Sequence, residues 1–380
     1  MATQDIEQTF FDFFQKESRF YSQNEIFSQT EIRNFYELVL EEGNIDETLE
    51  KCKHLLTEIS PCIASDLALL CGAWVEDGGD PKICLDSCFA LLKILSEKVL
   101  PYVANKPEGI EKEETATPKK GLLDSLSTAF KQLYEKVLPT SQNPVEAGEI
   151  NEEETRHWNE TQSLLQNLSK KERKELEDNV AAINLLVLPL MTMLMRAKEC
   201  RKKYVSGDYI EYDIIERLYY SETLEMEELY YLEQAFHISD IDSVFVIFPP
   251  QNIGIEVAIE GINNNFHFFT LLQDVIKEKA KDLGLQIETK QRGREEAHYH
   301  YLQANAYTKG NCTANMLMAW GEAAVYQNTT KNGQAILIAD KMQMKSRSWS
   351  GFVDIIHDAQ KSSVTFKRIL YQEEIEACLQ

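Results

Sequence analysis

The chain has 380 residues, of which 43% are hydrophobic, and its formal net charge is −23. This length and composition are sufficient for two or three domains that each bury a substantial core. Nucleic-acid affinity comes largely from Lys and Arg side chains that displace counterions, so the acid excess argues against DNA or RNA binding. Solubility explains the same excess, and a basic protein partner is the alternative.

The charge is unevenly distributed along the chain. Residues 1–100 and 101–240 carry net charges of −11 and −10, whereas residues 241–380 carry −2. The sequence begins with Asp5 and Glu7 where a secretion signal would have basic residues before an apolar run. We therefore expect a cytoplasmic protein whose acidity belongs to its first two thirds.

The first hundred residues have the spacing of consecutive helices. Ser60-Pro61 and Asp80-Pro81 each place an N-cap residue before a proline at the first helical position, where the missing N–H costs nothing. This pattern predicts a helical hairpin with helices over about 61–75 and 81–100. Residues 1–103 are therefore expected to form a helical domain.

Several cysteines in this domain raise the question of a zinc site. Zinc ligands usually have Cys-x2-Cys or His-x3-His spacing, which is not found here. Cys84, Cys88, Leu92 and Leu95 recur at helical intervals, which predicts that the thiols fill the core as small hydrophobes. The cysteines concerned, with a histidine nearby at His54, are Cys52, Cys62, Cys71, Cys84 and Cys88.

The next part of the chain is expected to be a linker over 104–120 and a helical region over 121–240, with a polar loop near 139–152. The linker has two prolines and one large aliphatic residue, too few apolar groups to order it. The apolar window Ala181–Met195 is shorter than the roughly 20 residues that cross a bilayer, and it contains Pro189. It predicts a core helix, bent or broken at the proline, and no membrane segment.

The run "YIEYDIIERLYYSETLEMEELYYLEQAF" over residues 209–236 is crowded with tyrosine and glutamate. One interpretation is a set of amphipathic helices with the rings packed inward and the hydroxyls at the edge. The alternative is an exposed tyrosine-rich face that binds a partner.

At Asp242 the helical spacing gives way to alternation, with runs of Val, Ile, Tyr and Phe bounded by Gly, Pro or Asn. One amphipathic helix is expected within this part, over 266–283. The sequence therefore predicts an α+β multidomain protein. All-helical N-terminal and middle regions are followed by a C-terminal α+β domain, residues 241–380, with a largely antiparallel sheet.

Glu296, His298 and His300 alternate along one predicted strand and therefore share one of its faces. Two imidazoles at this spacing can hold a divalent metal, with the glutamate as a third ligand or as the partner that orients His298. The competing interpretation is a structural pair on a sheet, which we favour, so no cofactor is expected. His267 and His357 have ordinary explanations, as a helix start and a strand end.

Lys345, Arg347 and Trp349 form the one segment suited to a phosphate or a nucleic acid, because they combine cations with an aromatic ring. No glycine-rich phosphate loop accompanies them. An edge strand protected by basic side chains gives the same pattern.

The common catalytic motifs are not found in the sequence. Together with the helical hairpin and the acidic helical regions, this favours a protein-interaction or scaffold protein over an enzyme. The expected partner is another protein, and the sequence does not specify an oligomeric state. The alternative function is a ligand-binding or metal-dependent enzyme that uses the C-terminal sheet around Glu296, His298 and His300.

Overall fold

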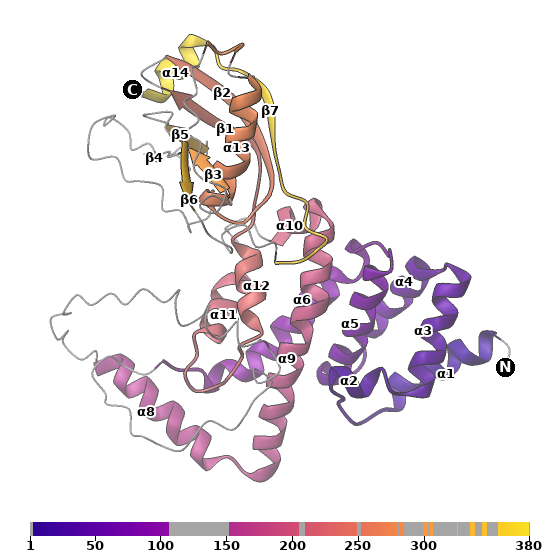
Figure 1. Ribbon diagram of the computed structural model, residues 1–380. Coiled ribbons are helices and arrows are strands. Elements are labelled where there is room, and N and C mark those ends of the chain that lie inside the picture. The colour runs from indigo at the N-terminus through magenta and orange to yellow at the C-terminus, as the bar shows by residue number, and fades with distance from the viewer. Residues whose placement is uncertain are drawn as a thin grey trace.

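The structure, a computed structural model, consists of a helical body and a sheet body, which are in contact at α10 (Lys198–Tyr204) (Figure 1). The predicted fold class is confirmed, because the N-terminal and middle regions are helical and the C-terminal region contains a largely antiparallel sheet. The structure describes residues 3–105, 152–204, 210–248, 252–279, 281–284, 299–302, 305–306, 325, 335–338, 344–347 and 356–379.

The helical hairpin predicted near residues 61–100 is present. Its first helix begins at Pro61 with Ser60 at the N-cap position. The second begins at Lys82, one residue later than expected, and Asp80 Oδ1 accepts a hydrogen bond from Lys82 N at 2.9 Å, as expected of a capping carboxylate. The N-terminal helices are α1 (Thr3–Lys16), α2 (Gln23–Ile26), α3 (Thr30–Glu42), α4 (Ile45–Leu55), α5 (Pro61–Glu76) and α6 (Lys82–Val99), followed by the 3-10 helix η1 (Leu100–Tyr102).

The middle of the chain continues with α8 (Glu152–Asn167), α9 (Lys170–Arg196), α10, α11 (Ile210–Tyr219) and α12 (Leu229–Phe236). A capping box starts α9: Ser169 Oγ accepts from Glu172 N at 3.3 Å, and Ser169 N donates to Glu172 Oε2 at 2.8 Å. The linker and polar loop expected over 104–120 and 139–152 lie outside the described residues, apart from residues 104, 105 and 152.

Helix α9 is the central element of the helical body and packs against α5, α6, α10 and α12. It runs through Pro189 as one continuous helix, so of the two expected forms, bent or broken at the proline, the broken one is not observed. Its length and composition would allow it to cross a membrane, but 72% of its most apolar window is buried within the protein. A helix in the core of a protein can have the same length and composition and is buried in this way. This helix is therefore only weak evidence for a membrane segment.

One hydrophobic cluster runs through all these helices. It includes side chains as far apart in sequence as Phe10, Trp74, Leu186 and Leu232. Pairs of aromatic rings link α1 and α3 to α5, because Phe10 and Phe35 each contact Trp74, with 5.9 and 6.0 Å between ring centroids. The N-terminal and middle helices are therefore held together by burial of a common core.

The sheet body is built on a five-stranded sheet of order β4-β5-β1-β2-β7, in which only the β1–β5 pair is parallel. Helix α13 packs on one face of this sheet and buries Phe268, Leu272 and Ile276 against it in a second hydrophobic cluster. The helix expected over 266–283 is therefore present with a shorter C-terminal end. The elements are β1 (Ser239–Phe248), β2 (Ile253–Ile262), α13 (Asn265–Lys279), β4 (Asn305–Ala306), β5 (Ala335–Ile338), β7 (Ser363–Ile369) and the final helix α14 (Gln372–Leu379).

The two bodies meet at a buried ion pair between α10 and β1. Arg201 and Asp240 have side chains only 1% and 3% exposed, and their contacts are Nε–Oδ2 at 2.8 Å and Nη2–Oδ1 at 3.0 Å. Arg201 Nη1 also donates to the carbonyl oxygens of Leu194 and Met195, at the end of α9. A single guanidinium thus caps α9 and holds the first strand of the sheet.

More exposed contacts surround this pair. Lys198 and Lys202 both contact Asp242, and His357 Nε2 lies 3.1 Å from Glu76 Oε1. The bodies are therefore joined by polar contacts around a short covalent connection from α12 to β1.

Candidate functional site

The residues predicted for a metal site are only partly described by the structure. His300 lies in β3 (Tyr299–Leu302), whereas Glu296 and His298 lie outside the described residues. Of the predicted phosphate or nucleic-acid residues, Lys345 and Arg347 lie in β6 (Met344–Arg347), and Trp349 lies outside the described residues.

Strands β3 and β6 form a two-stranded antiparallel sheet, which brings the two predicted segments side by side. The backbone register pairs His300 with Ser346, between Lys345 and Arg347. Both the metal interpretation and the structural interpretation of the His300 strand stay predictions.

The other two histidines of the sheet body have local roles. His267 lies in the first turn of α13, where its Nδ1 accepts a hydrogen bond from Asn263 N at 3.3 Å. Burial lowers the pKa of His267 to about 4, so the imidazole is neutral at physiological pH. His357 lies between the two bodies, against Glu76.

The cysteine stripe predicted on the second helix of the hairpin lies in the core. Cys84, Cys88, Leu92 and Leu95 are at most 1% exposed, and Cys84 Sγ donates to Leu49 O at 3.3 Å. Burial raises the pKa of Cys88 well above its ordinary value, so this thiol stays protonated. Within the described ranges, no three His, Cys, Asp or Glu side chains are grouped as in a metal site.

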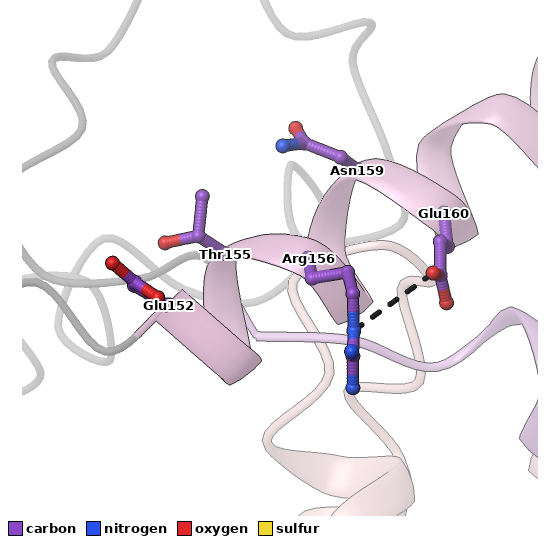
Figure 2. A pocket seen from close by; sticks show the side chains of 5 residues that line it. All are labelled: Glu152, Thr155, Arg156, Asn159 and Glu160. Atoms are coloured by element: carbon purple, nitrogen blue, oxygen red, sulfur yellow. Dashed lines mark ion pairs between the residues drawn. The ribbon is translucent and has the colours of Figure 1, made fainter.

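The surface depressions of the described residues are shallow. One, of about 390 Å³, lies along a single face of α8 and is lined by Thr155, Arg156, Asn159, Glu152 and Glu160 (Figure 2). Arg156 and Glu160 form an ion pair with 4.0 Å between Nε and Oε1. These polar side chains come from consecutive turns of one exposed helix and enclose no reacting centre.

A more distinctive feature lies on α11 and α12, where four tyrosine rings form a continuous chain. Neighbouring ring centroids are 4.8 Å apart for Tyr219 and Tyr220, 6.0 Å for Tyr219 and Tyr230, and 5.5 Å for Tyr230 and Tyr231. Tyr220, Tyr230 and Tyr231 are 53%, 40% and 41% exposed. We call these four residues the acidic tyrosine surface, because carboxylates surround them in the sequence.

The local sequence explains why these rings are at the surface. The core-facing sides of the two helices are already filled by smaller apolar residues, among them Ile215, Leu218 and Leu232. Because a helix has 3.6 residues per turn, a tyrosine directly before or after one of these residues points away from the side that faces the core. The rings of Tyr220, Tyr230 and Tyr231 are therefore exposed rather than packed inward, and binding of a partner by this face stays a prediction.

The loop between α11 and α12 is fixed to the helical body. Thr223 Oγ1 donates to Tyr102 O at 2.6 Å and accepts from Ala104 N at 3.1 Å, and Glu222 N donates to Ala104 O at 3.1 Å. This anchoring holds the two helices, and with them the rings, in a defined geometry. In Figure 1, α11 and α12 lie on the opposite side of α6 and α9 from α1 to α4.

The electrostatic surroundings of the rings are negative. Residues 210–236 contain eight acidic residues and one basic residue, Arg217. Burial raises the pKa of Tyr220, and the charges of Glu233 and Glu216 raise it further. The phenol therefore stays neutral, and its ring lies in a negative potential.

The contacts of His237, at the end of α12, were not predicted from the sequence. His237 Nε2 lies 3.1 Å from Tyr212 Oη and 3.3 Å from Glu233 Oε1, so the imidazole links α11 to the end of α12. The spacing of Glu233 and His237, four residues apart on a helix, is a signal that could have revealed their contact. Arg201 and Asp240 have no such signal, because they are distant in sequence and meet only in the fold.

Comparison with known proteins adds no functional information. No family model matches the sequence, and neither a curated protein nor a solved structure shows significant similarity to it. Function therefore has to be argued from the described surfaces alone.

Proposed function

We propose that this is a protein-interaction or scaffold protein without catalytic activity, and that its partner docks on the acidic tyrosine surface. The observation that carries the proposal is the chain of rings formed by Tyr219, Tyr220, Tyr230 and Tyr231, three of them at least 40% exposed. Tyrosine is enriched in protein interfaces because it combines apolar area with a hydroxyl that can pair with a partner or with water.

The rigidity of the surface supports this function. Side chains and loops that become ordered on binding reduce affinity, and a preformed surface avoids this cost. The hydrogen bonds of Thr223 and the link from His237 to Tyr212 already hold α11 and α12 in place. A cluster of rings in a fixed arrangement has the properties of an interface hot spot.

The thiols support a cytoplasmic location for this activity. The six cysteines whose side chains the structure describes are all free, and five of them are buried. Free thiols are typical of a reducing compartment, where disulfides are rare.

The test is photo-crosslinking of the full chain in an extract of the native host. A benzophenone amino acid is incorporated at position 231 and, as a matched control, at position 371, because Tyr371 is a 72% exposed tyrosine on the sheet body. We expect a discrete crosslinked protein from position 231 that disappears when Tyr220→Ser is introduced. Equal crosslinking from both positions, or none from position 231, would contradict the proposal.

A further inference from the structure

The partner of the acidic tyrosine surface can be specified further, on the basis of the function proposed above. Residues 210–236 have eight carboxylates against one guanidinium. A partner that brought more carboxylates to this surface would be repelled, whereas a basic partner would be attracted before contact. Charge complementarity therefore favours a basic segment.

The same chain shows how a tyrosine ring and a carboxylate bind a cation together. The guanidinium carbon of Arg368 lies 5.6 Å from the ring centroid of Tyr371, and its nitrogens contact Glu374 at 2.7 and 2.8 Å. A cation within about 6 Å of an aromatic face is attracted by the ring quadrupole, and the carboxylate adds charge-assisted hydrogen bonds. Two similar arrangements are Arg19 with Tyr21 and Glu25, and Lys203 with Tyr204 and Asp86.

Tyr220 has a ring and nearby carboxylate charge as in these arrangements, Tyr231 has an exposed ring, and no described cation lies over either ring. In the part of the chain that the structure describes, the cations placed over rings lie at Tyr21, Tyr204, Phe366 and Tyr371. The charges of Glu216 and Glu233 act on Tyr220, and both Tyr220 and Tyr231 are accessible from solvent. An incoming cation would therefore complete a contact of a kind that this chain already makes elsewhere.

We propose that the acidic tyrosine surface binds a basic polypeptide segment whose arginine side chains stack on Tyr220 and Tyr231 and pair with the exposed glutamates of residues 222–228. Arginine is favoured over lysine because its planar guanidinium stacks on an aromatic face, is more weakly hydrated than an ammonium, and still offers donors to a carboxylate.

The test measures binding of fluorescein-labelled nona-arginine and nona-lysine to the full chain by fluorescence anisotropy. We expect nona-arginine to bind more tightly, and both affinities to fall as NaCl is raised, because salt screens exposed charges. The double variant Tyr220→Ala/Tyr231→Ala should weaken nona-arginine binding by roughly 5- to 30-fold, as expected for the loss of two exposed cation–π contacts.

Two matched variants separate ring chemistry from charge and folding. Tyr220→Phe/Tyr231→Phe keeps both rings and should retain most of the affinity, and Tyr371→Ala removes an exposed tyrosine elsewhere and should change little. Equal affinity for the two peptides, with no effect of the alanine double variant, would show that only the net charge is recognised and would overturn the inference.

The crosslinking experiment distinguishes this failure from failure of the proposed function. A neutral or acidic protein crosslinked at position 231 would leave the interaction function in place and reject the basic partner. Absence of any crosslinked partner, together with arginine-specific binding that depends on the rings, would reject the interaction function while supporting the ligand chemistry.

Discussion

Gly72 of α5 lies directly against Pro189 of α9: a Cβ atom at Gly72 would be only 2.8 Å from the Cα and Cβ atoms of Pro189. The two helices can therefore approach this closely only because one of them has no side chain at the contact. The backbone of Pro189 cannot move away easily, since α9 also packs against α6 and α12.

The first prediction follows from this contact. Helix propensity alone would make Gly72→Ala stabilising by about 1 kcal/mol. We expect the opposite, a decrease of about 1 to 3 kcal/mol in the free energy of unfolding, because the methyl group overpacks the contact. Urea denaturation of the variant decides the sign, and Ala73→Gly in the same helix calibrates the propensity effect. A more stable Gly72→Ala protein would show that α9 can shift away.

The second prediction concerns Asp66, a carboxyl of α5 that is 0% exposed. Its Oδ2 accepts from Tyr21 N at 3.0 Å, while its Oδ1 is buried without a hydrogen-bond partner. Burial raises the pKa of Asp66 to about 8. The hydrogen bond from Tyr21 opposes this shift, and the charges of Glu25 and Glu17 add to it.

Since the folded-state pKa of Asp66 lies above its unfolded value near 3.8, the folded protein holds this proton more tightly. The contribution of Asp66 to stability is therefore greatest below about pH 4, falls as pH rises to about 8, and is constant above that. Asp66→Asn keeps an acceptor for Tyr21 N and should raise the melting temperature at pH 8, with the advantage shrinking toward pH 4. Melting temperatures measured across this range test it, and a parallel pH profile for the two proteins would contradict it.

The third prediction concerns the buried pair between the two bodies. Arg201→Met leaves Asp240 buried without its cation, and such a change typically costs about 3 to 5 kcal/mol. The double variant Arg201→Met/Asp240→Asn removes both charges and should cost less than the sum of the single changes. Urea denaturation of the single and double variants measures this coupling. Lys202→Met, which removes an exposed partner of Asp242, is the control and should have a much smaller effect. Additive effects would mean that the pair contributes no specific interaction.

The fourth prediction concerns Glu296, His298 and His300. We expect the protein, purified without chelator or affinity tag, to contain less than about a tenth of an equivalent of any transition metal, because two imidazoles alone do not hold a metal and the sequence offers no convincing third ligand beyond Glu296. Elemental analysis makes the measurement, with His298→Ala/His300→Ala as the control. A stoichiometric metal in the wild type that is absent from the double variant, and is lost as pH falls through about 6, would establish a metal site there.

The helical and sheet regions could be predicted because their signals are local. Pro61 marked a helix start and the alternation after Asp242 marked strands, and both patterns depend on neighbouring residues. The course of α9 through Pro189 could not be predicted in this way, since tertiary packing against α5 and α6 outweighs the local effect of a proline.

The candidate site was harder to predict for a similar reason. The composition of residues 209–236 indicated a tyrosine-rich region, but which rings are exposed depends on the sides that α11 and α12 turn toward the core. Side-chain alternation also placed Glu296, His298 and His300 together, without indicating that β6 would pair with the histidine strand. Contacts between segments that are distant in sequence therefore determine which tyrosine rings are exposed and which strand pairs with the histidine strand.

The hydrogen bond between His157 and Val103 has a further consequence for the connection between η1 and α8. His157 Nε2 lies 3.1 Å from Val103 O, so the chain leaves the helical body and returns to it at nearly the same point. The bond therefore ties an early turn of α8 to the residue after η1, so these two elements share one end although 54 positions separate the bonded residues.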